Sequence, residues 1–184
     1  MGNICRSPTA EAVFRKKLAE RDLLQKIKID SAVTHNFHPG SPPDERSQKH
    51  AFKRGYEMSN LRARAVNASD FEEFDLLLTM DWDNRALLQE RCPAPHIHKI
   101  RGFAEFLQTS TASVIPDPYY GGDTGFEHVL DLIEDASEGL MKFMLQKLQP
   151  WNKRHLTFWE RRSSPVRSLH SLDIFAMVAA KQMR

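Results

Sequence analysis

The opening segment of the chain constrains its fold and chemistry more than any other feature. Residues 2–8 read Gly-Asn-Ile-Cys-Arg-Ser-Pro and lead directly into apolar residues at helical spacing, at Ala10, Val13 and Phe14. Backbone amides at a helix N-terminus attract anions, and a guanidinium binds two oxygens of one oxyanion. The segment therefore predicts a phosphate-binding loop built around Arg6. Such a loop normally follows a buried strand, and no strand pattern precedes Gly2 in the printed sequence.

Alternating helix and strand patterns follow this loop. Helices are predicted over residues 9–24, 44–56, 59–64, 83–90 and 125–148, with a short helical turn over 102–107, and strands over 27–33, 74–80 and 97–100. The run at 74–80 is mostly apolar, which is typical of a strand buried on both faces. The alternation predicts a doubly wound parallel sheet that binds its ligand at the carboxyl ends of the strands.

Composition excludes several classes of protein. The chain has 184 residues, of which 41% are hydrophobic and 27% charged, as in a single soluble globular domain. No apolar run approaches the roughly 20 residues of a membrane span.

Cys5 and Cys92 provide no disulfide framework, so a cytoplasmic location is predicted. Histidines at positions 35, 38, 96 and 98 match no closed zinc pattern, and no metal is expected. The sequence does not indicate an oligomeric state.

The composition changes near residue 149. Residues 1–145 carry 18 Lys and Arg against 22 Asp and Glu, a net charge of −4, whereas residues 146–184 carry 8 against 2, a net charge of +6. We therefore predict a domain of residues 1–148 and a dispensable basic extension of residues 149–184, which is either disordered or non-native. A short packed helix around residues 171–180 is the alternative. No motif in the extension indicates nucleic-acid or membrane binding.

Asp117 is a candidate general acid. It stands between two prolines in residues 115–122, which read Ile-Pro-Asp-Pro-Tyr-Tyr-Gly-Gly. A carboxylic acid on a rigid loop can protonate the departing oxygen of a phosphate monoester and then activate water. Alone, the pattern fits a turn-forming aspartate better, because such residues are common in loops. Together with the phosphate-binding loop, it predicts acid–base catalysis.

The chain resembles the low-molecular-weight protein tyrosine phosphatase family over roughly residues 1–145. Residues 2–8 are similar to the end of the Cys-x5-Arg signature of that family, and residues 117–121 are similar to its general-acid motif. Further matches lie in order between them, at residues 30–34, 42–46, 70–71, 74–75, 80–81 and 84. The resemblance implies an α/β fold of three layers, with a doubly wound parallel four-stranded sheet (phosphotyrosine phosphatase I-like) whose first central strand is missing.

The resemblance also implies roles for individual residues. Arg6 and Asp117 are the expected catalytic residues, and Asp81 is expected to brace the loop from the end of a neighbouring strand. The expected substrate-binding residues are Gly2, Asn3, Ile4, Cys5, Ser7, Phe37, Tyr119 and Tyr120. The three aromatic residues among them either form walls for a phenyl ring or pack in the core. The substrate is expected to be a phosphotyrosine protein or a small aryl phosphate, with no cofactor.

Several of these positions keep a second interpretation. Ser7 either braces the loop or caps the first helix. Cys5 is either a thiol of low pKa at the helix start or a small buried loop thiol. Asp44 and Arg46 are expected to form a structural pair.

The nucleophile of the family signature has no counterpart in the printed sequence. Counting Cys-x5-Arg back from Arg6 leads to the position before Met1, and counting forward from Cys5 leads to Glu11. We therefore expect an in-frame upstream extension ending in Cys, and expect the chain as printed to be inactive and to fold poorly unless another segment fills the strand position. The alternatives are a non-catalytic phosphate-binding or interaction protein and, less favoured, an arsenate reductase relative, which needs further cysteines.

Overall fold

The computed structural model describes residues 3–34, 39–119, 121–148 and 172–177. Its centre is a parallel sheet of four strands, β1 (Ile27–Ala32), β2 (Leu76–Thr79), β3 (Ile100–Gly102) and β4 (Leu172–Met177), in the order β1-β4-β2-β3. Every pair of neighbouring strands is parallel. The predicted α/β class with a parallel sheet is therefore confirmed.

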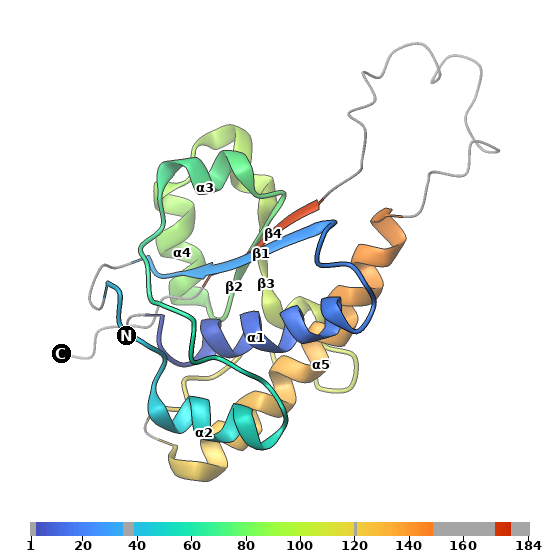
Figure 1. Ribbon diagram of the computed structural model, residues 1–184. Coiled ribbons are helices and arrows are strands. Elements are labelled where there is room, and N and C mark those ends of the chain that lie inside the picture. Colours follow the sequence, from blue (N-terminus) through green and yellow to red (C-terminus); the bar gives the residue numbers. More distant parts are fainter. Residues whose placement is uncertain (1–2, 35–38, 120, 149–171, 178–184) are drawn as a thin grey trace.

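Helices cover both faces of this sheet (Figure 1). On one side lie α1 (Arg6–Ala19), α2 (Glu45–Lys53) and α5 (Gly122–Leu148), and on the other α3 (Ala68–Glu73) and α4 (Trp82–Arg91). Alternate residues of β2 belong to two different cores, because Leu76 and Leu78 pack with α1 and α5, while Leu77 packs with residues of α3 and α4. All four residues of β2 are buried, which confirms the prediction from its apolar run.

The position of β4 differs from the sequence analysis. Ile174 pairs with Ile29 of β1 on one side and with Leu76 of β2 on the other, so β4 occupies a central place in the sheet. The segment lies within the extension assigned to residues 149–184, and it is a strand where a short helix was the alternative. Strands β1 and β2 would otherwise present open edges with backbone N–H and C=O groups that need partners. The expected gap in the sheet is therefore filled from the C-terminal side.

Two other predicted elements are wrong in place or type. Residues 59–64 are irregular rather than helical, and Val33 forms an isolated bridge with Ala65 beside them. The strand predicted at 97–100 is instead the end of a 3-10 helix, Ala94–Lys99, followed by β3. Pro93 and Pro95 favour that helical start because the proline φ angle suits the first turn. A second 3-10 helix, Phe103–Phe106, confirms the helical turn over 102–107.

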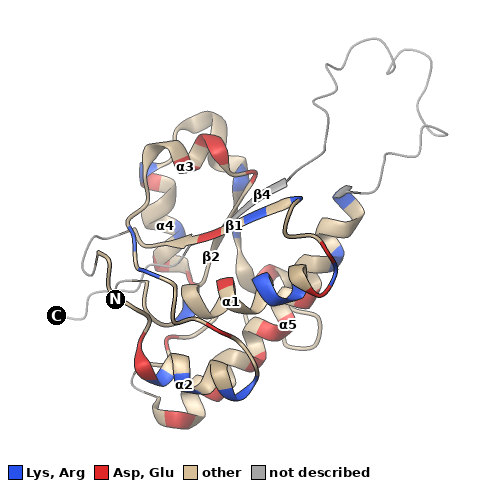
Figure 2. Ribbon diagram, in the orientation of Figure 1, with Lys and Arg blue, Asp and Glu red and all other residues tan. Residues whose placement is uncertain are grey.

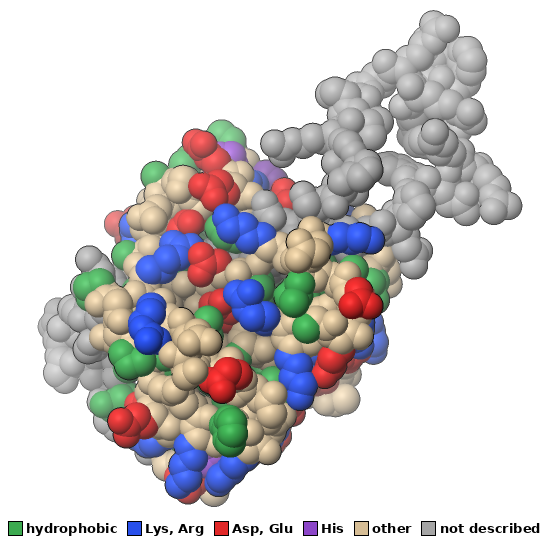
Figure 3. Space-filling model, viewed as in Figure 1, with side chains coloured by type: hydrophobic (Ala, Val, Ile, Leu, Met, Phe, Trp, Pro, Cys, Tyr) green, Lys and Arg blue, Asp and Glu red, His purple; other side chains and the backbone are tan. Residues whose placement is uncertain are grey.

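Charged residues of both signs are interspersed over the described helices and strands (Figure 2). On the face shown in Figure 3, they alternate with isolated hydrophobic side chains. Among the described residues, no helix is both long enough and apolar enough to cross a membrane.

Candidate functional site

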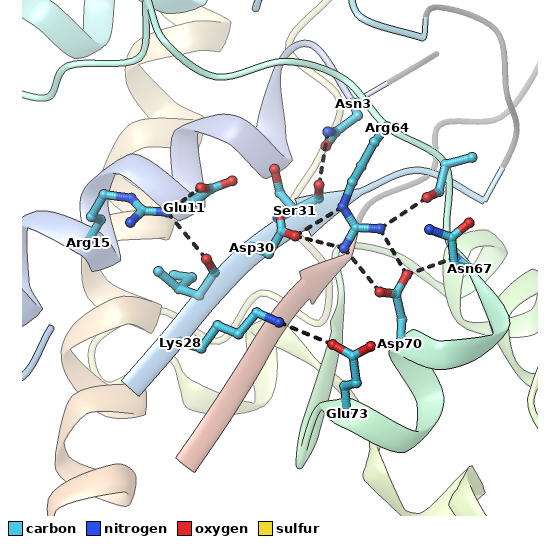
Figure 4. A network of polar contacts seen from close by, with 12 residues as sticks. Asn3, Glu11, Arg15, Lys28, Asp30, Ser31, Arg64, Asn67, Asp70 and Glu73 are labelled. Carbon is cyan, nitrogen blue, oxygen red and sulfur yellow. Dashed lines mark hydrogen bonds and ion pairs between the residues drawn. The ribbon is translucent and has the colours of Figure 1, made fainter. Parts of the chain in front are cut away.

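The anion loop, residues 3–7, lies at the carboxyl edge of the sheet and is held by several elements. Asn3 has a left-handed backbone with φ 61°, a conformation that asparagine tolerates better than most residues. Its side-chain amide donates to the carbonyl of Ser31 at the end of β1, at 3.3 Å (Figure 4). The carbonyl of Ile4 accepts from the backbone N–H of Asp44 at 2.8 Å. The loop is therefore attached both to β1 and to the start of α2.

The end of β1 is itself anchored by an arginine. Arg64 forms ion pairs with Asp30 of β1 at 2.8 Å and with Asp70 of α3 at 2.9 Å, as Figure 4 shows. Asp70 also accepts from the backbone N–H of Asn67 in a capping box at the start of α3. These contacts fix the strand that supports Asn3.

Arg6 is the first residue of α1 and only 3% of its side chain is exposed. Its Nη1 donates to Asp81 Oδ2 at 2.7 Å and to the carbonyl of Ile115 at 2.8 Å. Its Nη2 lies 3.8 Å from Asp117 Oδ2, an ion-pair distance too long for a hydrogen bond. Asp81 and Asp117, which were both singled out from the sequence, therefore lie beside the Arg6 guanidinium. The three residues span 111 positions of the chain.

Asp81 and Asp117 reach Arg6 from two different segments. Asp81 follows β2 and caps α4, because its Oδ1 accepts from the backbone N–H of Asn84 at 2.8 Å. The segment before Asp117 is attached to β2 through Ile115 N–H, which donates to the carbonyl of Met80 at 2.7 Å. Asp117 is 32% exposed at its side chain, and its Oδ1 accepts from the N–H of Tyr119 at 3.0 Å. A partly exposed carboxyl beside a buried guanidinium can exchange protons with a bound substrate.

Cys5 is the residue that precedes α1, and burial raises the pKa of its thiol to about 11. The nearby Ser47 hydroxyl opposes this shift only in part. At neutral pH the group is therefore a thiol rather than a thiolate, and the interpretation as a thiol of low pKa is wrong. Cys5 instead lines a small internal space with Ser47, His50 and Phe126.

Ser7 lies one residue inside α1 and does not cap it, so the capping interpretation is wrong. Its hydroxyl is fully buried and has no hydrogen-bond partner among the described residues. The same holds for Asn3 Oδ1. Buried polar atoms of this kind are rare and call for a partner. Both lie in the anion loop, where the Ser7 hydroxyl can donate to an anion and Asn3 Oδ1 can accept from a water molecule beside it.

Three predicted substrate-binding residues, Gly2, Phe37 and Tyr120, lie outside the described residues. Tyr119 is described, and its ring centroid lies 4.7 Å from the Arg46 guanidinium. The expected pair of Arg46 with Asp44 is present at 2.9 Å. No group of three or more potential metal ligands occurs within the described part of the chain.

Sequence reasoning missed Ser47 and His50 beside Cys5. Both are buried, and both face inward from α2. Their spacing of three residues on a predicted helix was the available signal.

Comparison with known proteins agrees with this geometry. The family model described as low molecular weight phosphotyrosine protein phosphatase matches residues 1–150. A putative low molecular weight protein-tyrosine-phosphatase from Synechocystis is 42% identical over 149 residues, covering 80% of this chain and 94% of the relative. YfkJ, a low molecular weight protein-tyrosine-phosphatase from Bacillus subtilis, is 36% identical over 149 residues, covering 81% and 94%.

Solved structures show the same similarity. A crystal structure of protein tyrosine phosphatase from Entamoeba histolytica, with Hepes in the active site, superposes with a TM-score of 0.77 at 41% identity, covering 80% of this chain and 94% of the other. On the strength of the matching family model and these relatives, the chain belongs to the low molecular weight phosphotyrosine protein phosphatase family.

Proposed function

We propose that the anion loop binds the phosphoryl group of phosphotyrosine, in a protein or a small aryl phosphate, and that Asp117 is the general acid. The observation that carries this proposal is the meeting of buried Arg6 with Asp81 and Asp117. A guanidinium offers a planar fork to two phosphoryl oxygens and offsets their charge. Asp81, hydrogen-bonded to Nη1, sets the direction in which that fork points.

The reaction that follows from these roles has two steps. A thiolate attacks phosphorus, the bond from phosphorus to the tyrosine oxygen breaks, and Asp117 gives its proton to that oxygen. Water then gives a proton to the Asp117 carboxylate and attacks phosphorus, so the bond to sulfur breaks and inorganic phosphate leaves. We place the thiolate six positions before Arg6, where the Cys-x5-Arg signature of the family has its cysteine. Cys5 does not fit that spacing, and burial raises its pKa to about 11, so it is protonated at neutral pH. A chain that begins at Met1 is then expected to bind phosphate without turnover.

A short N-terminal prefix tests the position of the nucleophile. Adding Met-Cys before Met1 places a thiol six residues before Arg6, while β4 keeps its place in the sheet. We expect hydrolysis of p-nitrophenyl phosphate by this chain, and none by the printed chain or by a matched Met-Ser prefix. If the chain without a prefix hydrolyses the substrate, and Cys5→Ser abolishes that activity, the proposal is contradicted.

The second candidate is a non-catalytic phosphate-binding protein of the same fold. The protonated state of Cys5 favours it for the chain as printed. Phosphate binding by all three chains, with turnover by none, would support this second candidate. Both candidates fit a cytoplasmic location, which we propose because Cys5 and Cys92 are free and buried.

A further inference from the structure

We propose that Arg46 is a positioning residue that holds the segment carrying Asp117 in a set place relative to the anion loop. This inference deepens the proposed function and rests on the role given there to Asp117. The sequence suggested only a structural pair between Arg46 and Asp44. The geometry shows that the same guanidinium also contacts the acid segment, residues 117–119.

On the side of the acid segment, Arg46 contacts Tyr119 in two ways. Its Nη1 donates to the carbonyl of Tyr119 at 3.1 Å, and its guanidinium carbon lies 4.7 Å from the centre of the Tyr119 ring. The guanidinium also lies 4.9 Å from the ring of Phe126, which is buried on α5. The N–H of Tyr119 meanwhile donates to Asp117 Oδ1 at 3.0 Å. Residue 119 is therefore held at its carbonyl by Arg46 and at its amide by Asp117.

On the side of the anion loop, Arg46 contacts Asp44. Its Nε and Nη2 donate to the two carboxylate oxygens of Asp44 at 3.1 and 2.9 Å. Partial burial of Asp44 opposes its charged form, but the hydrogen bonds from Arg46 outweigh this and hold the pKa of the carboxyl below its usual value. The backbone N–H of Asp44 donates in turn to Ile4 in the anion loop at 2.8 Å.

These contacts form one continuous path from Ile4 through Asp44, Arg46 and Tyr119 to Asp117. The path matters because Arg6 approaches Asp117 only to 3.8 Å and makes no hydrogen bond to it. Ile115 attaches the segment before Asp117, to Met80 and to Arg6, and Arg46 attaches it after Asp117, at Tyr119. Both attachments are needed to keep the carboxyl at a set distance from a phosphoryl group on the loop. Small misplacements of a catalytic group, on the order of 1 Å, cost about 10²-fold in rate.

This position requires an arginine because three nitrogens of the Arg46 side chain donate hydrogen bonds at the same time. Nε and Nη2 face Asp44 while Nη1 faces Tyr119, a division that follows from the planar fork of the guanidinium. A lysine ammonium is a point charge and cannot span both partners in this way. The side chain of Arg46 is 43% exposed, so its contribution is to geometry more than to stability.

Hydrogen exchange on the full-length chain tests the mechanical link without any turnover. We expect Arg46→Met and Arg46→Lys to speed amide exchange in residues 115–121 by about tenfold, with α1 and α5 unchanged. The matched control is Arg62→Met, because Arg62 donates to the carbonyls of Ser59 and Leu61 in its own loop. Unchanged exchange in residues 115–121 would overturn the proposal.

Turnover by the chain with the Met-Cys prefix tests the catalytic consequence. We expect Arg46→Met to lower kcat/KM by about tenfold for phenyl phosphate, which has a poor leaving group, and by about threefold or less for p-nitrophenyl phosphate. Inhibition by inorganic phosphate should stay within about twofold, because Arg6 and the loop amides are untouched. The double variant with Asp117→Asn should be no slower than Asp117→Asn alone.

The outcomes separate this inference from the proposed function. Equal losses on both substrates, or additive losses in the double variant, would overturn the role of Arg46. If Asp117→Asn itself shows no dependence on the leaving group, the proposed general acid is wrong, while the exchange experiment still decides whether Arg46 holds the segment.

Discussion

At the scale of single residues, the site depends on which groups carry charge in the folded protein. Arg6 is buried with an ion-pair partner at 2.7 Å, so its charge is compensated. Burial raises the pKa of Cys5 more than Ser47 and Arg46 lower it, so Cys5 keeps its proton at neutral pH. The same helix start therefore holds a charged guanidinium beside a neutral thiol. This difference could not be predicted from the sequence, because it depends on burial by α2 and α5.

The raised pKa of Cys5 predicts a loss of stability at alkaline pH. The unfolded thiol ionises near 9.0, while the folded one keeps its proton to about pH 11. Its stabilising contribution is therefore complete below pH 9 and is lost as the pH rises toward 11, by at most about 2–3 kcal/mol. Urea unfolding measures the free energy of unfolding at pH 8 and at pH 10.5. Between these two pH values it should decrease less for Cys5→Ala than for the unsubstituted chain. Equal decreases would contradict the shift.

Asp117→Asn should slow the chain that carries the Met-Cys prefix, because the amide cannot donate the proton that the leaving oxygen needs. We expect a loss of about 10²–10⁴-fold on phenyl phosphate and a smaller loss on p-nitrophenyl phosphate, measured as kcat/KM, which reports the step that breaks the bond to the leaving oxygen. Asp22→Asn is the matched control, since Asp22 is exposed and its left-handed backbone suits asparagine. An equal loss on both substrates would rule out the general acid.

At the scale of elements, hydrophobic periodicity predicted the helices and strands that have a clear apolar pattern. It failed where contacts between distant segments determine the local structure. The helix α5 and the strand β2 follow their apolar patterns closely, whereas α1 ends at Ala19, before the predicted end at residue 24. Residues 59–64 are irregular because Arg62 donates to nearby carbonyls and the following Arg64 turns toward Asp30 and Asp70. The short helix α3 was missed, although Asn67 followed by Asp70 is a capping signal that the sequence displays.

The strand β4 was missed for a different reason. Five of its six residues are apolar, with Asp173 as the exception, and so short a stretch does not distinguish a strand from a helix by periodicity. It also lies in a basic segment, far in sequence from the strands that it joins. Only the open edges of β1 and β2 in the folded sheet select a strand there.

From the central place of β4 we now predict that residues 149–184 are needed for stability, although the sequence analysis expected them to be dispensable. Ile174→Pro removes a backbone N–H from a strand with a neighbour on each side, which should cost about 3 kcal/mol or more. Removal of residues 149–184 should lower the melting temperature at least as much as Ile174→Pro does. Ile174→Val is the matched control and should change the melting temperature little. If Ile174→Pro and the truncation both leave it unchanged, β4 does not support the sheet.

At the scale of the whole molecule, the parallel sheet brings distant segments to one edge. Arg6 starts α1, Asp81 follows β2 and Asp117 lies on the segment attached beside it, and all three meet because parallel strands end on the same side. The sequence predicted these three residues from motif order. It did not predict the hydrogen bond of Arg46 to the carbonyl of Tyr119, since this bond depends on how α2 and α5 pack.

The central claim is that residues 3–7 and Arg6 form an oxyanion site, and phosphate binding by the printed chain tests it most directly. Titration with inorganic phosphate, followed by amide chemical shifts, should show saturable changes in residues 3–7. Arg6→Lys should weaken this binding by about tenfold or more, because a point charge replaces the fork. Arg15→Lys, on the exposed side of the same helix, should leave it unchanged. Shifts that do not saturate, or equal affinity in the Arg6→Lys variant, would contradict the account.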